Sequence, residues 1–226
     1  SRAGESVTTS TKNTIIGYVA GNAVTTGANN TLVGYATAAT SLGLTTGSNN
    51  QLFGSQCDTA AADTSDAHAL GFNLDCTGGY TTLGKSTLDI RAQHGVATWS
   101  TVSDERVKKD ITDATAGLSF INDLRPRTFK YKAKGDIPQE FNGYEEGSTE
   151  PYKFSTTEHG FIAQEVKEVI DNHSEINDGF KMWSERETGQ QEVAETALIP
   201  ILTKAIQELS SQVDELEAEI QTLKGE

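Results

Sequence analysis

The motif VTTGANNTLVGY at residues 24–35 recurs in register as LTTGSNNQLFGS at residues 44–55. Each copy joins a short β-prone run to a Gly-Asn turn, where glycine and asparagine tolerate a positive φ. Weaker copies of its hydrophobic-Gly-hydrophobic step occur at Ile16-Gly17-Tyr18, Leu70-Gly71-Phe72 and Leu83-Gly84-Lys85. Because one such unit cannot bury its apolar face alone, the copies are expected to stack as in a β-solenoid or β-roll.

A low-complexity linker rich in threonine, glycine and asparagine is the alternative interpretation of this region. The match between the two copies, which stays in register over the whole motif, disfavours it. Over about residues 13–85, the repeats resemble the head repeats of trimeric adhesins and phage fibre shafts. That resemblance implies that the short rolls of three chains pack around one axis.

The composition of the whole chain limits its function. Its 226 residues carry a formal charge of −14 and are 35% hydrophobic. This apolar fraction is low for a monomeric core, so either the fold is thin and repetitive or several chains share a core. The acidic balance argues against a nucleic-acid partner, because phosphates would be repelled.

We expect no membrane insertion and no signal peptide, and Ser1-Arg2-Ala3-Gly4 suggests a piece of a longer protein.

Charge divides the chain near residue 100. Residues 1–100 carry 4 basic and 6 acidic side chains, whereas residues 101–226 carry 14 and 26. We therefore expect a β-repeat fibre segment, an α+β domain and a terminal coiled coil, at residues 1–102, 103–198 and 199–226. Inside the α+β domain the pattern predicts helices at Ala114–Leu124 and Phe161–Ile170, strands at Thr128–Lys132 and Lys181–Trp183, and a long excursion over 135–157.

The last segment carries an unbroken heptad pattern. Apolar residues alternate spacings of three and four at Ile199, Leu202, Ile206, Leu209, Val213, Leu216, Ile220 and Leu223. A helix packed on its own domain is the alternative, but a strict two-in-seven seam is narrower than such helices show. Ile and Val at one seam position with Leu at the other favour dimers, whereas the β-rich repeats favour trimers. We predict a trimeric coiled coil.

A search for other chemical sites finds little. The sequence has no Walker loop, no Rossmann fingerprint and no cluster with zinc spacing, so neither a cofactor nor a metal is expected. Cys57 and Cys76 fit a disulfide and free thiols equally well. The four histidines are scattered, and each is interpreted as a surface or capping residue: His68, His94, His159 and His173.

The stretch SDERVK at residues 103–108 lies at the composition boundary. It is followed by a helix, by LRPRTFKY at 124–131, by HGFIAQEV at 159–166 and by the coiled coil. In this order the segments of residues 103–226 resemble the endosialidase-type intramolecular chaperone domain. That autoproteolytic domain ends many phage tail spikes and tail fibres, and it also occurs in some membrane-bound eukaryotic factors.

The resemblance implies a mechanism of self-cleavage and the residues that carry it out. The domain helps the upstream β-fibre to trimerise and fold, then cuts itself off with a Ser–Lys dyad. By motif position, Ser103 is the nucleophile, Lys108 is the base and Val102–Ser103 is the bond that breaks. His159, Gln164 and Glu165 fit positioning or packing roles better than direct chemistry.

The dyad makes demands on its surroundings. A serine hydroxyl needs a neighbour to remove its proton, and a lysine can do this only if its pKa falls well below its ordinary value. Burial, together with the nearby charges of Arg106 and Lys109, would lower the pKa of Lys108. The carboxylates of Asp104, Glu105 and Asp110 would oppose this, so we expect them to point elsewhere. On local grounds alone, Ser103 is equally a fair helix N-cap.

Spacing adds a constraint on the dyad. Residues five apart lie about 140° apart on a helix and on opposite faces of a strand. Ser103 and Lys108 can therefore meet only across a turn, or through a lysine from a neighbouring chain. Our hypothesis is that the site is completed in the assembled trimer, which would make cleavage a report of correct folding.

These arguments predict the C-terminal part of a phage tail fibre or tail spike. It would fold in the host cytoplasm and end in the virion as a homotrimer, with a host-surface receptor or glycan as a possible partner. The alternative is a permanent trimeric surface adhesin shaft whose SDERVK stretch is inert. A peptidase that cuts other proteins is disfavoured, because nothing in the sequence resembles a substrate cleft.

Overall fold

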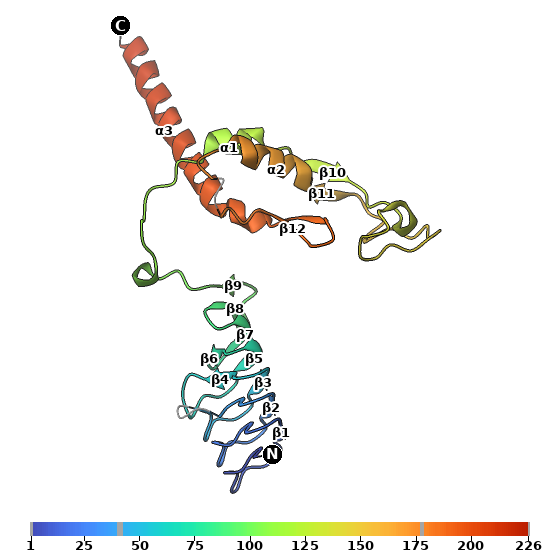
Figure 1. Cartoon of the computed structure of the whole chain (residues 1–226). Coiled ribbons are helices and arrows are strands. Elements are labelled where there is room, and N and C mark those ends of the chain that lie inside the picture. Colours follow the sequence, from blue (N-terminus) through green and yellow to red (C-terminus); the bar gives the residue numbers. More distant parts are fainter. Residues whose placement is uncertain (1, 40–42, 177–178, 226) are drawn as a thin grey trace. The chain divides into compact units, whose positions relative to one another are not determined.

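The computed structural model describes residues 2–39, 43–176 and 179–225 of the chain. They form two compact units, Ser1–Asp110 and Ile111–Glu226 (Figure 1). The predicted boundaries at residues 102 and 198 remain predictions, and by its contacts the segment 103–110 belongs to the first unit. None of the described helices is long and apolar enough to cross a membrane.

The first unit is a β-solenoid-like stack of coils. Its main sheet has the order β1-β2-β3-β5-β7-β8-β9, parallel from β1 to β7 and antiparallel for the last two pairings. A second, two-stranded parallel sheet pairs β4 with β6. The strands are β1 Thr14–Ile16, β2 Thr31–Val33, β3 Gln51–Phe53, β4 Asp58–Thr59, β5 His68–Phe72, β6 Asp75–Cys76, β7 Tyr80–Lys85, β8 Leu88–Gln93 and β9 Trp99–Ser100.

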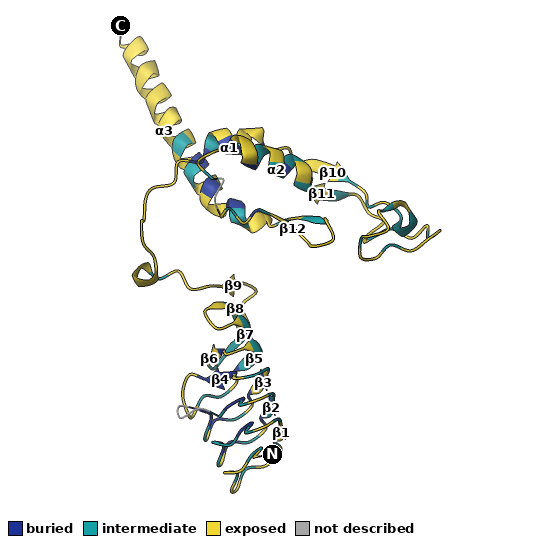
Figure 2. Ribbon diagram, in the orientation of Figure 1, coloured by how far each residue is buried: buried dark blue, intermediate teal, exposed yellow. Residues whose placement is uncertain are grey.

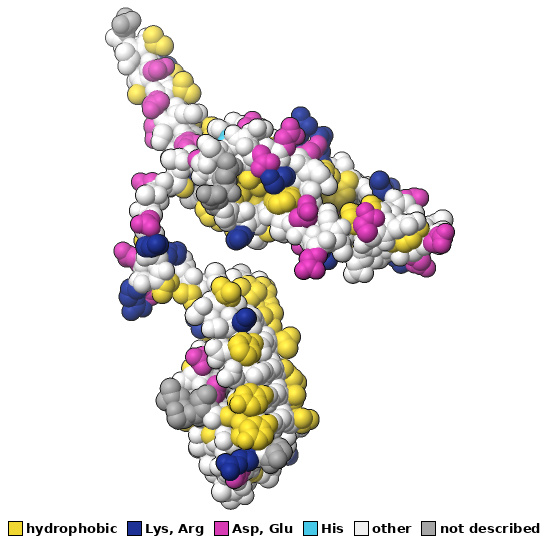
Figure 3. Space-filling view, viewed as in Figure 1, with side chains coloured by type: hydrophobic (Ala, Val, Ile, Leu, Met, Phe, Trp, Pro, Cys, Tyr) yellow, Lys and Arg dark blue, Asp and Glu magenta, His cyan; other side chains and the backbone are white. Residues whose placement is uncertain are grey.

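The sequence repeat lays one coil directly on the next. Leu32 pairs with Leu52 in the β2–β3 register, and both side chains are buried inside the stack (Figure 2). Ile16, Phe53 and Leu70 occupy one register position in β1, β3 and β5 and point outward, where they remain 58%, 40% and 61% exposed. Figure 3 shows hydrophobic side chains in a row along this unit. The coils thus bury one apolar column and leave another uncovered.

An asparagine ladder joins successive coils. The Oδ1 atom of Asn13 accepts from the Asn30 backbone N at 2.8 Å, that of Asn30 from the Asn50 N at 2.9 Å, and that of Asn50 from the Ala67 N at 2.9 Å. The Asn30 amide also donates to the Gly47 carbonyl at 3.1 Å. Asn30 and Asn50 are fully buried. These bonds satisfy amide groups that would otherwise be costly to bury.

The glycines of the repeat allow coils to approach closely, and Gly34 and Gly54 also adopt a positive φ, at 140° and 134°. Asn29 and Asn49 adopt the positive φ, at 58° and 63°. A Cβ atom on Gly27 would lie 2.1 Å from the Gly47 carbonyl oxygen, and one on Gly34 would lie equally close to the Gly54 oxygen. The expected Gly-Asn turn is therefore present, but a side chain at Gly27 would push two coils apart.

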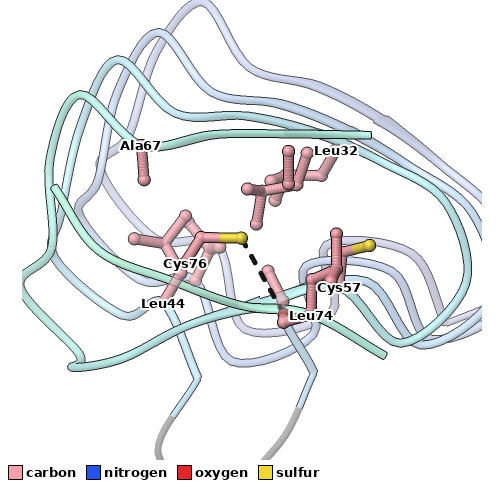
Figure 4. Packing of buried hydrophobic residues seen from close by; sticks show 10 residues of the cluster. Leu32, Leu44, Cys57, Ala67, Leu74 and Cys76 are labelled. Atoms are coloured by element: carbon pink, nitrogen blue, oxygen red, sulfur yellow. Dashed lines mark hydrogen bonds between the residues drawn. The ribbon is translucent and has the colours of Figure 1, made fainter. Parts of the chain in front are cut away.

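Cys57 and Cys76 are free thiols buried within the stack (Figure 4). Burial raises the pKa of both, that of Cys76 to about 12. The Cys76 thiol lies 3.9 Å from the Leu74 carbonyl oxygen. The thiols therefore act as small apolar groups of the core, which decides between the two states that the sequence left open.

The second unit mixes short helices and hairpins around a core that contains Phe120, Val166, Ile170 and Met182. Antiparallel pairs join β10 to β11 and β12 to β13. The elements are α1 Leu118–Asp123, β10 Arg127–Phe129, η2 Lys134–Asp136, β11 Glu158–Gly160, α2 Ala163–Asn172, β12 Trp183–Glu185, β13 Gln191–Val193, η3 Glu195–Leu198 and α3 Ile199–Lys224. The predicted α+β character is present, with strands shifted by one or two residues.

The first predicted helix is shorter than Ala114–Leu124. It begins at Leu118, whose backbone N donates to the Glu208 carboxylate of α3 at 2.8 Å. Gly117 allows this contact, because a Cβ atom there would lie 2.5 Å from the same carboxylate. A distant side chain thus sets where α1 starts.

Helix α3 is 26 residues long and carries Pro200 in its first turn, as expected. On one face, Ile201 and Ala205 are buried against the core of the second unit. The heptad seam lies on another face and is exposed along its whole length, with exposed fractions from 41% at Leu202 to 73% at Leu223 (Figure 2). Packing on the helix's own domain therefore covers its start and leaves the seam free.

Candidate functional site

The proposed cleavage site lies in the segment that follows the last strand of the solenoid. After β9 the chain passes Val102 and Ser103 and enters the single 3-10 turn η1, Glu105–Val107. The Val107 and Lys108 backbone N atoms donate to the Asp104 and Glu105 carbonyls at 3.2 and 3.0 Å. These two bonds reverse the chain between Ser103 and Lys108.

Asp104 caps this turn. Its Oδ1 atom accepts from the Arg106 backbone N at 2.9 Å, and the Arg106 guanidinium binds both carboxylate oxygens, at 2.9 and 2.6 Å. These bonds from the Arg106 side chain, followed by the one from its backbone N, lower the pKa of Asp104. Asp104 is therefore ionised and engaged with Arg106. The N-cap role suggested for Ser103 is wrong by one residue, which leaves the serine hydroxyl for another contact.

Ser103 and Lys108 meet across the turn. Lys108 Nζ donates to Ser103 Oγ at 2.7 Å within one chain. A regular helix or strand would keep the two apart, but here both flanks of η1 are extended, with ψ near 134° at Asp104 and 153° at Lys108. Of the two arrangements that the spacing allows, the turn is sufficient for contact, and no lysine from a neighbour is needed to form it.

The surroundings of this pair are open in the single chain. Ser103 and Lys108 are both exposed. Neighbouring charges are partly paired elsewhere, since Asp104 binds Arg106 and Lys109 lies 4.0 Å from Asp110. The residues of this turn therefore bury neither side chain of the pair.

The remaining predicted site residues belong to the second unit. His159 lies on β11, paired with Thr128, and is exposed. Glu165 on α2 binds the Arg127 guanidinium at 2.9 Å, and this bond lowers the pKa of the carboxyl. Gln164 and His159 line one cavity of about 600 Å³. Glu165 thus ties α2 to β10.

Sequence reasoning missed the contact between Thr101 and Asp89, just upstream of the proposed cleavage site. Thr101 Oγ1 donates to the Asp89 carbonyl at 3.2 Å. Val102 and Val107 line a hollow of about 700 Å³ together with Asp89 and Arg91. No motif marked Thr101 or Asp89, because their proximity arises from the pairing of β8 with β9.

One histidine has the capping role that was expected as one of two alternatives. His173 caps the C-terminus of α2, and its side chain is also buried. Its Nε2 and Nδ1 atoms lie 2.9 Å from the carboxylates of Asp123 and Glu175. Bonds to Glu175 first and then Asp123 raise the pKa of His173, so the protonated form is stabilised in the folded unit.

The stability of the second unit is therefore expected to depend on pH. Because the pKa of His173 is raised by folding, its contribution is complete below the ordinary histidine value of about 6.5 and is lost as pH rises through the folded value. Urea unfolding at pH 6 and pH 8 should show His173→Gln losing about 1–3 kcal/mol more at pH 6. The exposed His159→Gln is the control, and equal losses for His173→Gln at both pH values would contradict the assignment.

No group of three or more side chains suited to a metal ion occurs among residues 2–39, 43–176 and 179–225. Residues 103–175, about a third of the chain, match the model of peptidase family S74, described as chaperone of endosialidase. No curated protein and no solved structure matches the chain. The expected endosialidase-type chaperone domain is confirmed for the matched residues, which begin at Ser103.

Proposed function

We propose, from the chaperone domain in residues 103–175, that this chain is part of a phage tail fibre or tail spike. Its chaperone drives trimerisation and folding of the β-shaft and then releases itself by cutting Val102–Ser103. The observation that supports this most is the 2.7 Å contact between Lys108 Nζ and Ser103 Oγ, at the first residues of the family match.

The chemistry follows from the position of the nucleophile directly after the bond. Neutral Lys108 takes the proton of the Ser103 hydroxyl, and Oγ attacks the Val102 carbonyl carbon. The C–N bond then breaks as Lys108 returns the proton to the Ser103 nitrogen. This leaves Val102 esterified to Ser103 Oγ and a free Ser103 amine. Water hydrolyses the ester to the Val102 carboxylate and the Ser103 hydroxyl.

Two exposed apolar surfaces support assembly with two further copies of the chain. One is the heptad seam of α3, in which every seam residue is at least 41% exposed. The other is the outward column of the solenoid that includes Ile16, Phe53 and Leu70 (Figure 3). Soluble chains rarely leave such continuous apolar rows open. A trimer would cover both with the same partners.

Assembly also supplies what the dyad lacks. Ser103 and Lys108 are in contact but exposed, so the turn itself supplies none of the burial that favours a neutral amine. A partner chain that covers the turn would desolvate the ammonium and favour the neutral amine. Cleavage would then report assembly even though the dyad forms within one chain.

A removable chaperone suits a β-shaft built from three chains. Such shafts depend on non-local pairing and expose strand edges until complete, so they fold slowly and tend to aggregate. A coiled coil raises the local concentration of the chains. Its removal leaves the shaft kinetically trapped. Folding would precede incorporation into the virion, where the shaft is available to a surface receptor or glycan.

Incubation of the purified chain, followed by a denaturing gel, tests the proposal. Two pieces, residues 1–102 and 103–226, should replace the full chain, and Ser103→Ala should keep it whole. Hydroxylamine should speed cleavage of the intact protein, because it attacks the ester intermediate. A single stable band would instead favour the permanent adhesin shaft with an inert SDERVK stretch.

A further inference from the structure

The peptide upstream of the proposed cleavage site is fixed to the end of the solenoid. Strand β9 pairs antiparallel with β8, Ser100 opposite Arg91 and Trp99 opposite Ala92. Strand β8 pairs along its whole length with β7, the last strand of the parallel stack. The residues before the bond are thus an added strand of the shaft.

One side-chain bond extends this attachment towards the bond itself. Thr101 Oγ1 donates to the Asp89 carbonyl of β8 at 3.2 Å. Only Val102 lies between Thr101 and Ser103. The threonine therefore anchors the peptide one residue before the carbonyl that Ser103 would attack.

The downstream side of the bond faces the same place. Val107 of η1 and Val102 both line the hollow of about 700 Å³ beside Asp89 and Arg91. The turn that carries Lys108 therefore borders the same end of the solenoid as the peptide before the bond.

We propose that Thr101, with the β8–β9 pairing, positions the acyl side of the bond for the proposed self-cleavage. This inference rests on the proposed function. Catalysis by a dyad depends on holding the reacting atoms in a near-attack geometry, and a free peptide would sample many others. Because β8 and β9 stay with the shaft, cleavage requires that the last coil of the shaft is closed as well as that the chaperone has assembled.

Matched substitutions in the full chain test this role. Thr101→Val keeps the shape of the side chain but removes the donor, and it should slow the first-order cleavage rate about 3- to 10-fold. Thr101→Ser keeps the donor and should cleave within about twofold of the unaltered chain. Thr8→Val is the control, because it removes the same kind of bond, Thr8 Oγ1 to the Thr25 carbonyl at 3.0 Å, at the other end of the solenoid.

The readouts separate positioning from general stability. Thr101→Val should lower the rate at every pH without moving the midpoint of the pH–rate profile, since Lys108 is retained. Its thermal unfolding should match that of Thr8→Val. Equal rates for Thr101→Val and Thr101→Ser would overturn the positioning role alone, as would equal slowing by Thr8→Val. Failure of the unaltered chain to cleave would instead overturn the proposed function, and the positioning role with it.

Discussion

Lys108→Ala is expected to slow release of fragment 103–226 by about 10²- to 10⁴-fold, because Ser103 loses the amine that removes its proton. Lys109→Ala is the matched control. It removes a neighbouring charge, which lies 4.0 Å from Asp110, but keeps the amine that contacts Ser103, so it should slow cleavage far less than Lys108→Ala. A gel time course of each variant measures the two rates. Equal slowing by both substitutions would show that cleavage depends on the positive charge of the segment and not on the Ser103–Lys108 pair.

A mixture of chains distinguishes the origin of the lysine. Assemblies that combine Ser103→Ala chains with Lys108→Ala chains should show no recovered cleavage, because the 2.7 Å contact joins residues of one chain. Recovered cleavage would show that the base acts across chains, as the spacing alone had suggested. Either result leaves the nucleophile and the bond unchanged.

If α3 forms the proposed trimeric coiled coil, Leu209→Asp is expected to leave the chain monomeric, since it would place three carboxylates in one layer of the seam. Leu209 is 45% exposed in the single chain, so the substitution does not disturb the core of its own unit. Sedimentation in a Ser103→Ala background measures the assembly of intact chains. Ser211→Asp, two residues away and outside the seam, should remain trimeric.

The same substitution in the chain that keeps Ser103 tests whether a partner chain buries Lys108. A Leu209→Asp monomer should retain the Ser103–Lys108 contact but lose cleavage, because no partner chain covers Lys108 to favour its neutral amine. A monomer that cleaves at the normal rate would contradict the dependence of cleavage on assembly. A Leu209→Asp chain that stays trimeric would remove the seam as the interface.

The repeated coils and the long helix were predictable from the sequence, because the same residue types recur at a fixed spacing in each. The repeat at 24–35 and 44–55 gave the stacking of coils, and the heptads gave a long helix with an exposed seam. The start of α1 was not predictable, since it depends on Glu208, which is distant in the sequence. The burial of His173 likewise depends on Asp123 and Glu175, which no motif connects.

The two residues of the candidate site could be proposed from the sequence, but the contacts that hold the turn and the peptide around them could not. The family resemblance identified Ser103 and Lys108, and spacing alone showed that a turn or a second chain must join them. The choice of the turn depends on Asp104, which caps η1 and binds Arg106. Thr101 was missed, because its partner Asp89 becomes a neighbour only through the β8–β9 pairing.

The asparagine ladder has a consequence for how such a protein can change in length. Its rungs connect residues that are 17, 20 and 17 positions apart, with nearly the same hydrogen-bond distance each time. Each rung needs one asparagine and the backbone N of the following coil, whatever the number of residues between them. Whole coils could therefore be duplicated or deleted as modules, giving longer or shorter stacks while residues 103–175, which match the chaperone model, stay the same.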